Sequence, residues 1–128
     1  MIPDLIPIRY EPGSHAEYVG RFDSGQYVGF CFYLEPEQNR PVALLHRFDG
    51  RGDHTGTEIW EGPDAEARLA AAVAALPGGR PGGVRAAPFA VEAFGATVGL
   101  IPREDGAGVE YRPYGLAFFP PWDGTYDT

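Results

Sequence analysis

The frequency of proline and glycine limits most strongly what this chain can fold into. The 128 residues include 13 prolines and 18 glycines, spread so that they divide the chain into short segments. Such a distribution is typical of short strands joined by tight turns. Apolar residues make up 44% and aromatic residues 13% of the chain, as in proteins that bury a core. We therefore expect one folded domain dominated by short strands.

The clearest hairpin signal lies in the first quarter of the chain. Residues 1–17 read as an extended, proline-punctuated lead-in, and 18–22 as a first strand. The segment 23–25 is a turn signal because it ends in Gly25, which can adopt a positive φ. Residues 26–34 carry apolar side chains at both parities, which predicts a central strand covered on both faces.

A single helix is predicted over about 64–76. Pro63 suits the first helical turn and Asp64 complements the helix dipole there. The glycines that follow residue 77 are expected to end the helix. One apolar stripe along this helix comprises Ala65, Leu69, Val73 and Leu76.

The remaining segments complete an α+β fold. Turns or loops are expected at 35–40, 50–56, 80–83 and 103–108, and further strands at 42–48, 57–61, 87–93, 96–102 and 109–119. Short strands around one helix predict a single α+β domain spanning 1–128, mainly an antiparallel sheet of about six or seven strands.

The charge of the chain limits its partners. Eighteen acidic residues oppose ten basic ones, all arginine, for a net charge of −8. Such a charge repels nucleic acids and anionic membranes and favours a basic protein partner, although it also serves plain solubility. The single cysteine, the lack of a signal-peptide pattern and the lack of a long apolar run predict a cytoplasmic protein.

One cluster of side chains has the chemistry of metal ligands. It comprises His46, Asp49, Asp53, His54 and Glu58. The spacing matches no compact ligand motif. His46 also shares strand parity with Val42, Leu44 and Phe48, which favours a core histidine hydrogen-bonded at one nitrogen. We therefore predict no metal site and no cofactor.

The candidate nucleophiles and the glycine motifs are each typical of a structural role. Cys31 lies within an apolar strand, where a free cysteine behaves as a small hydrophobe. Ser14 and Ser24 have turn-like neighbours. The glycine-rich segment 78–83 follows a helix and precedes a strand, the reverse of a phosphate-binding loop. The Arg-Gly-Asp tripeptide at 51–53 indicates a flexible loop. Because none of these residues lies in a catalytic arrangement, no catalytic residue is predicted.

The last residues contain the densest aromatic patch. In one interpretation Leu116, Phe118 and Trp122 cap the domain's own core, and the prolines at 120 and 121 end the strand. In the other, aromatic anchors and acidic neighbours face outward as a partner-binding surface, because Trp and Tyr are favoured at interface hot spots. That candidate surface comprises Phe119, Trp122, Asp123, Tyr126 and Asp127.

Four segments resemble a family of small bacterial proteins labelled formate hydrogenlyase regulatory proteins. They are 18–26, 43–50, 59–60 and 121–128, and the ending Pro-Trp-Asp-Gly-x-Tyr-Asp-Thr is the most specific. The resemblance runs over most of the chain and implies a regulator that acts by protein contact without a cofactor. It brings no catalytic residues, and it implies that the ending belongs to the domain.

Three hypotheses follow for function. The leading one is a non-enzymatic protein-binding or regulatory module, with an immunity-type protein that neutralises a basic toxin as a specific form. The second is a small metal-dependent or acid–base enzyme that uses His46, Asp49, His54 and Glu58. The third is a purely structural subunit or a homodimer formed through an edge strand or the aromatic ending.

Overall fold

The computed structural model describes residues 2–33, 40–113 and 115–127. Within these ranges the chain forms eleven strands and one helix. In chain order they are β1 (Ile6–Ile8), β2 (Tyr18–Phe22), β3 (Gly25–Tyr33), β4 (Pro41–Phe48), β5 (His54–Glu61), α1 (Ala65–Ala74), β6 (Arg80–Pro81), β7 (Val84–Ala86), β8 (Phe89–Ala93), β9 (Ala96–Pro102), β10 (Val109–Arg112) and β11 (Leu116–Phe118).

The strands form three antiparallel sheets. The largest has the order β5-β4-β3-β2-β6, the second β11-β10-β9-β8, and the third is the pair β1-β7. Neighbours in the two larger sheets are mostly consecutive in sequence, as short turns dictate. The exception in these two sheets is β6, which pairs with β2. The third sheet, β1 with β7, also joins distant parts of the chain. The α+β class, the antiparallel sheets and the single helix of the prediction are therefore confirmed.

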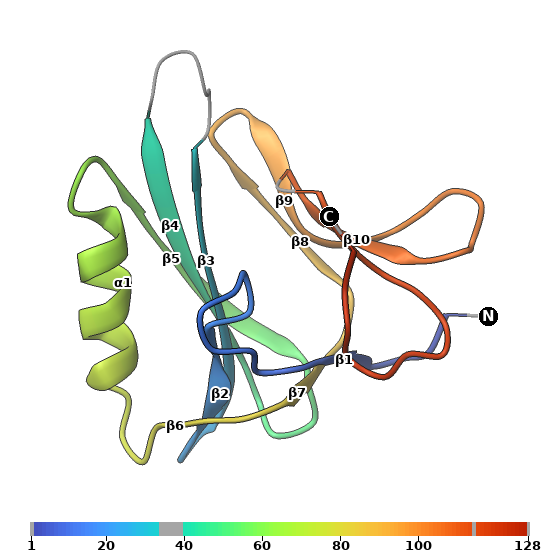
Figure 1. Cartoon of the computed structure of the whole chain (residues 1–128), viewed down its shortest axis with the longest axis horizontal. Helices are drawn as coiled ribbons and strands as arrows, with labels where there is room; N and C mark the ends of the chain where they lie inside the picture. Colours follow the sequence, from blue (N-terminus) through green and yellow to red (C-terminus); the bar gives the residue numbers. More distant parts are fainter. Residues whose placement is uncertain (1, 34–39, 114, 128) are drawn as a thin grey trace.

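The central strands of the largest sheet are covered on both faces, as predicted for 26–34. The helix α1 lies along one face of β3, β4 and β5, and the second sheet lies on the other side (Figure 1). Successive side chains of a strand point to opposite faces. The helix side holds Tyr27, Ala43 and Leu45, and the main core on the other side holds Val28, Phe30, Val42 and Leu44.

The helix sits close to the sheet at Gly29. A Cβ atom there would lie 2.9 Å from Leu69 Cδ1, so the glycine makes room for the fully buried Leu69. Val73 and Leu76 pack at the margin of the same cluster, which confirms the predicted apolar stripe. The helix is shorter than predicted at both ends, and the Asp64 side chain pairs with Arg68 instead of capping the helix N-terminus.

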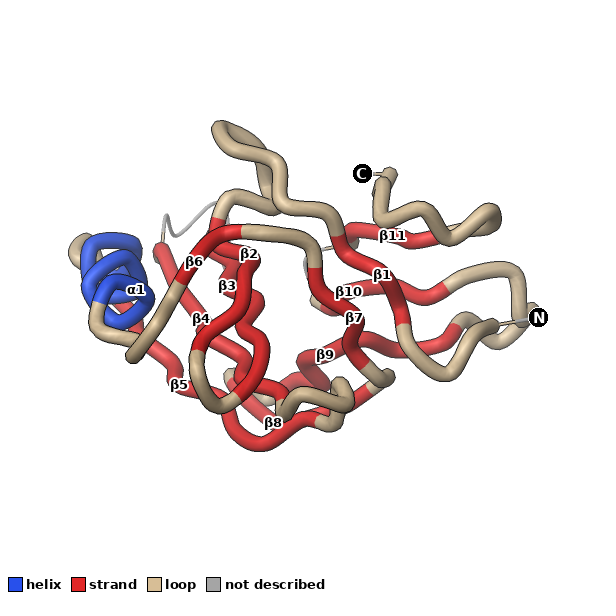
Figure 2. Tube along the Cα trace, turned by 90° about the horizontal axis from the view of Figure 1, so that it is seen from below, coloured by secondary structure: helices blue, strands red, loops and turns tan. Residues whose placement is uncertain are grey.

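The main core lies between the largest sheet, the β8–β11 sheet and the β1–β7 pair. Seen from below, the strands of all three sheets surround it (Figure 2). Its fully buried side chains come from every part of the chain, including Ile6, Val84, Leu100, Tyr111 and Phe118. The short outer strands therefore close the core that the large sheet leaves open.

Two strand predictions are wrong. The number of strands in the described residues is eleven in three sheets, not six or seven in one. The segment 109–119 is a hairpin of β10 and β11, because Pro113 lacks an amide donor and Gly115 adopts a φ of 89°. The lead-in contains β1, and the predicted loop at 80–83 contains β6.

The turn predicted at 35–40 lies, up to residue 39, outside the described residues. Within the described ranges, none of the helical structure has the length and apolar character needed to cross a membrane.

Candidate functional site

His46, one of the residues weighed as candidate metal ligands, is fully buried in the main core. Its ring lies on β4 with no exposed surface. Nδ1 lies 2.9 Å from Thr57 Oγ1, and Nε2 lies 2.7 Å from the Tyr111 hydroxyl. Burial lowers the His46 pKa to about 3, with a smaller contribution from His54. The prediction of a core histidine is confirmed, although two ring nitrogens are bonded and not one.

The second imidazole belongs to the same hydrogen-bonded chain. His54 Nε2 lies 2.8 Å from Thr57 Oγ1, so this hydroxyl bridges the two histidines. The His54 ring stacks on Phe89 of β8 at a centroid distance of 4.4 Å. Partial burial lowers the pKa of His54. Both imidazoles are therefore neutral near pH 7 and join the largest sheet to the second sheet.

The carboxylates of the predicted cluster point elsewhere. Glu58 forms an ion pair with Arg47, on the opposite face of β5 from Thr57. Asp49 is partly exposed, and its Oδ1 accepts hydrogen bonds from the amides of Arg51 and Asp53. No group of three His, Cys, Asp or Glu side chains within the described residues is arranged to hold a metal ion. Strand alternation separates the residues that sequence proximity had grouped.

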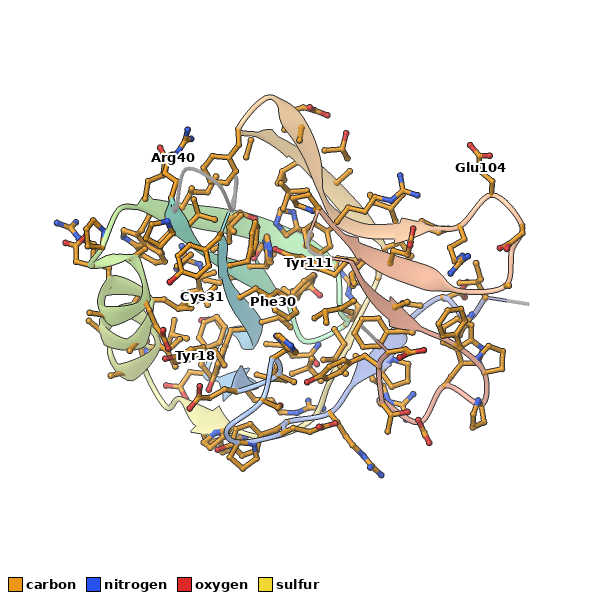
Figure 3. The ribbon with its side chains drawn as sticks, turned by 45° about the horizontal axis from the view of Figure 1, so that its top comes forward. Tyr18, Phe30, Cys31, Arg40, Glu104 and Tyr111 are labelled. Carbon is orange, nitrogen blue, oxygen red and sulfur yellow. The ribbon has the colours of Figure 1, made fainter. Side chains whose placement is uncertain are left out.

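Cys31 faces the helix at the edge of a surface groove of about 490 Å³. Figure 3 shows it on the helix side of the largest sheet, near Tyr18. Burial raises the Cys31 pKa to about 12, and the negative charges of Glu66 and Glu17 add to the shift. The Tyr18 hydroxyl donates to Glu66 Oε2 at 3.1 Å. The thiol stays protonated at neutral pH and is a poor nucleophile.

The two glycine motifs have structural roles. Residues 80–81 pair with β2 as β6, and Gly78 takes a φ of 69° after the helix. Gly52, in the Arg-Gly-Asp loop, takes a φ of 95° and lies against the backbone of Arg85. The first motif is a helix stop followed by an edge strand, and the second packs its glycine against β7.

The segment from Phe119 to Asp127, which we call the tail segment, lies against the domain. Ala117 and Asp127 exchange both backbone hydrogen bonds at 2.8 Å, so the segment returns alongside β11. The Gly124 carbonyl accepts from the Arg9 amide at 3.1 Å. Two backbone anchors thus hold the segment in one position.

The tail aromatics are neither fully buried nor fully exposed. Trp122 and Tyr126 pack at the margin of the main core. The Tyr126 hydroxyl accepts a hydrogen bond from the His15 amide at 3.1 Å, and its ring meets Phe118 edge-on at 6.1 Å. Phe119 is half-buried, and the Arg103 guanidinium lies 5.5 Å from its ring centroid. These rings hold the segment and still present part of their surface.

The acidic members of the candidate surface are exposed. Asp123 Oδ1 accepts hydrogen bonds from the Thr125 amide at 3.1 Å and the Thr125 hydroxyl at 2.7 Å. These bonds lower the Asp123 pKa, with a smaller contribution from Arg9. Asp127 is also exposed. All five predicted contact residues belong to this segment, in which the aromatic residues are partly covered and the two aspartates are exposed.

Sequence reasoning missed the partners that fix these groups. Tyr111 lies 65 positions from His46, and no local pattern links them. The orientation of Thr57 could have been predicted from the sequence. It directly precedes Glu58 on a predicted strand, and neighbouring residues of a strand point to opposite faces. Arg9 and His15 lie in the lead-in, far from the tail segment in sequence.

Comparison with known proteins gives no assignment. No protein-family model, no curated protein and no solved structure matches this chain. The resemblance to the regulatory family stays a prediction.

Proposed function

We propose that this protein is a non-enzymatic protein-binding or regulatory module whose contact surface is the tail segment. The observation that carries the proposal is the double anchoring of this segment by Ala117 and Arg9, with half-buried rings at its surface. A surface held in place before binding loses little conformational entropy when a partner arrives. Phe119, Trp122 and Tyr126 are the candidate anchors.

The charge supports a basic protein partner. Exposed Asp123 and Asp127 flank the aromatic rings, and the whole chain carries a net charge of −8. Opposite charges raise association rates, and Trp and Tyr supply affinity where they are desolvated on binding. An immunity-type role against a basic toxin is a specific form of this proposal. In either form the module acts in the cytoplasm.

The chemistry of the other candidate residues favours binding over catalysis. Both nitrogens of His46 are occupied and Cys31 is protonated at neutral pH. The resemblance to a regulatory family points the same way.

Affinity capture from the native host, followed by mass spectrometry, tests the proposal. Trp122→Ala is expected to reduce the captured partner about tenfold or more, because truncated hot-spot residues have effects of this size. Tyr33→Ala is the matched control, since Tyr33 is an aromatic residue of β3 with 57% exposure and lies outside the tail segment.

A charge variant separates loss of contact from loss of fold. Asp123→Asn removes the charge but keeps the Oδ1 acceptor for Thr125. It is expected to weaken capture of a basic partner and to reduce its salt dependence. Circular dichroism checks that each variant is folded. Unchanged capture by folded Trp122→Ala and Tyr126→Ala variants would show that the contact surface lies elsewhere.

A further inference from the structure

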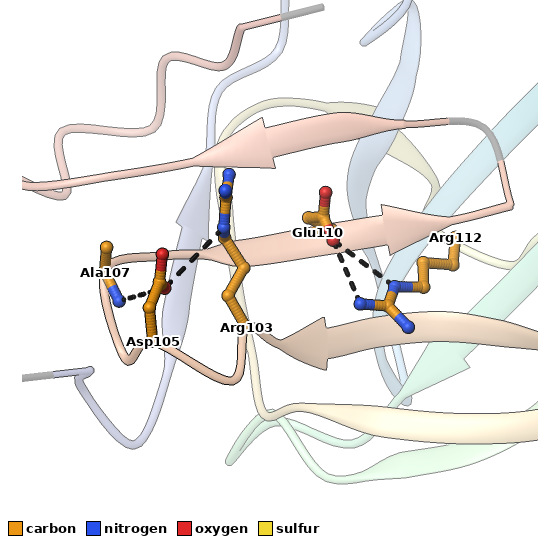
Figure 4. Close-up of polar contacts among 5 residues, drawn as sticks. All are labelled: Arg103, Asp105, Ala107, Glu110 and Arg112. Carbon is orange, nitrogen blue, oxygen red and sulfur yellow. Dashed lines mark hydrogen bonds and ion pairs between the residues drawn. The ribbon is translucent and has the colours of Figure 1, made fainter.

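Only some arginines of this acidic protein are paired with carboxylates. Five of the ten form ion pairs with carboxylates among the described residues. Figure 4 shows two of these pairs on the β9–β10 hairpin, where Arg103 meets Asp105 and Arg112 meets Glu110. Arg9, Arg21 and Arg85 are not in that group.

Strand geometry brings these three arginines together. In the β1–β7 pair, Arg85 lies directly opposite Pro7, while the buried Ile8 lies opposite Val84. Because side chains alternate, Arg9 shares the outward face of Pro7 and Arg85. In Figure 2, β7 lies beside β1, and β6, which precedes β7 in the chain, lies beside β2. The adjacent β2 contributes Arg21, whose Nε donates to the Gly83 carbonyl at 3.3 Å.

A surface pocket lies among these three arginine residues. It has a volume of about 170 Å³, and Arg9, Arg21 and Arg85 all line it. Asp123 and Gly124 of the tail segment form its remaining side. The hydrogen bond from the Arg9 amide to the Gly124 carbonyl fixes that side against β1. The pocket is therefore built from four separate parts of the chain.

The pocket carries a local positive charge. Three arginines and one aspartate line it, and the Asp123 carboxylate already accepts two hydrogen bonds from Thr125 through Oδ1. Guanidinium groups offer planar forks of donors that match the oxygens of phosphoryl groups. The excess of arginine over aspartate in the lining would attract an anion.

We propose that this pocket binds the phosphoryl group of a small molecule. Its volume is below the roughly 300–1,000 Å³ of pockets that enclose a whole drug-sized ligand, so it suits one compact anionic group with the rest of the ligand in solvent. A net charge of −8 repels a long polyanion such as nucleic acid. The site does not depend on the protein-binding proposal, because its ligand groups are the arginines and not the tail aromatics.

Titration followed by amide NMR tests this site, with inorganic phosphate and pyrophosphate as probes at constant ionic strength. We expect saturable shifts at Gly83, Arg85 and Gly124, tighter binding of pyrophosphate, and weaker binding of acetate. Arg85→Gln is expected to weaken phosphate binding about fivefold or more, because it removes one fork of charged donors.

Two further variants make the result decisive. Arg112→Gln removes the same charge from a guanidinium already paired with Glu110, and it is expected to change affinity by less than about twofold. Asp123→Asn is expected to tighten phosphate binding, whereas it weakens capture of a basic protein partner. The absence of saturable shifts, equal losses in Arg85→Gln and Arg112→Gln, or acetate binding as tight as phosphate would overturn the proposal.

Discussion

His46 illustrates how a titratable residue becomes part of an apolar core. A neutral imidazole has one donor and one acceptor nitrogen, so it needs one partner of each kind when it is buried. If Tyr111 donates to Nε2, then Nδ1–H donates to Thr57, and the Thr57 hydroxyl is free to donate to His54 Nε2. Every group in this chain of four is then satisfied, and both histidines are neutral.

This arrangement predicts acid sensitivity above the range where carboxylates titrate. The folded-state pKa of His46, about 3, lies below its ordinary value of 6.5, so its stabilisation is complete above about pH 6.5 and is lost as the pH falls toward 3. Between pH 7.5 and 5.5 the free energy of unfolding should fall by about 1.4 kcal/mol from this group. Urea denaturation at the two pH values measures it.

His46→Gln provides the control for that measurement. Glutamine also offers one donor and one acceptor but does not titrate. The variant is expected to be less stable at pH 7.5 and to have a flatter pH dependence. An equal pH slope in both proteins would contradict the assignment of the effect to His46.

At the scale of elements, one side chain joins two sheets. Gln26 of β3 is only 3% exposed. Its Nε2 donates to the carbonyls of Arg85 and Asp49 at 3.0 and 3.2 Å, and its Oε1 accepts from the Arg85 amide at 2.8 Å. The amide group thus substitutes for a neighbouring strand along β7, which has β1 on its other side.

Gln26→Ala should therefore destabilise the fold by about 2–3 kcal/mol, because it leaves buried backbone groups of β7 without partners. Gln26→Glu keeps the shape but turns a carboxylate toward two carbonyl oxygens, and it should cost at least as much. Guanidinium denaturation measures both. Thr97→Ala, at an exposed side-chain pair with Glu92, is the control and should change stability by less than about 0.5 kcal/mol. Wild-type stability of Gln26→Glu would refute this role.

At the scale of the whole molecule, the charge is unevenly compensated. Half of the arginines are paired with carboxylates and three others line one pocket, while eighteen acidic residues oppose ten basic ones for a net charge of −8. Like charges on a compact surface repel, and salt screens them over about 10 Å at 0.1 M. Repulsion of this kind is distributed over the surface and does not arise from a single pair of charges.

Raising sodium chloride from 20 mM to 300 mM should therefore raise the melting temperature by roughly 2–5 °C. Differential scanning calorimetry at constant pH measures the change. The exposed ion pairs oppose this trend, but each contributes little. A falling melting temperature would mean that the ion pairs outweigh the repulsion.

Local patterns were sufficient for much of the fold. The strands at 18–22 and 96–102 were predicted with the bounds that the structure has, because turn residues mark their ends. Strand parity put His46 inside the core, and helical spacing put Leu69 against the sheet. The candidate contact residues could also be selected from their composition, although the resulting surface still awaits a binding experiment.

The class of the fold, the single helix and the inward face of the main strands follow from local sequence alone, because periodicity and turn chemistry act over a few residues. Only the tertiary structure decided that β1 pairs with β7, that Tyr111 meets His46, and that three arginines share a pocket. Each of these contacts brings together at least one pair of residues more than 60 positions apart. Such pairings depend on how the whole core packs. Strands of two or three residues are too short for their partners to be predicted from an alternating pattern.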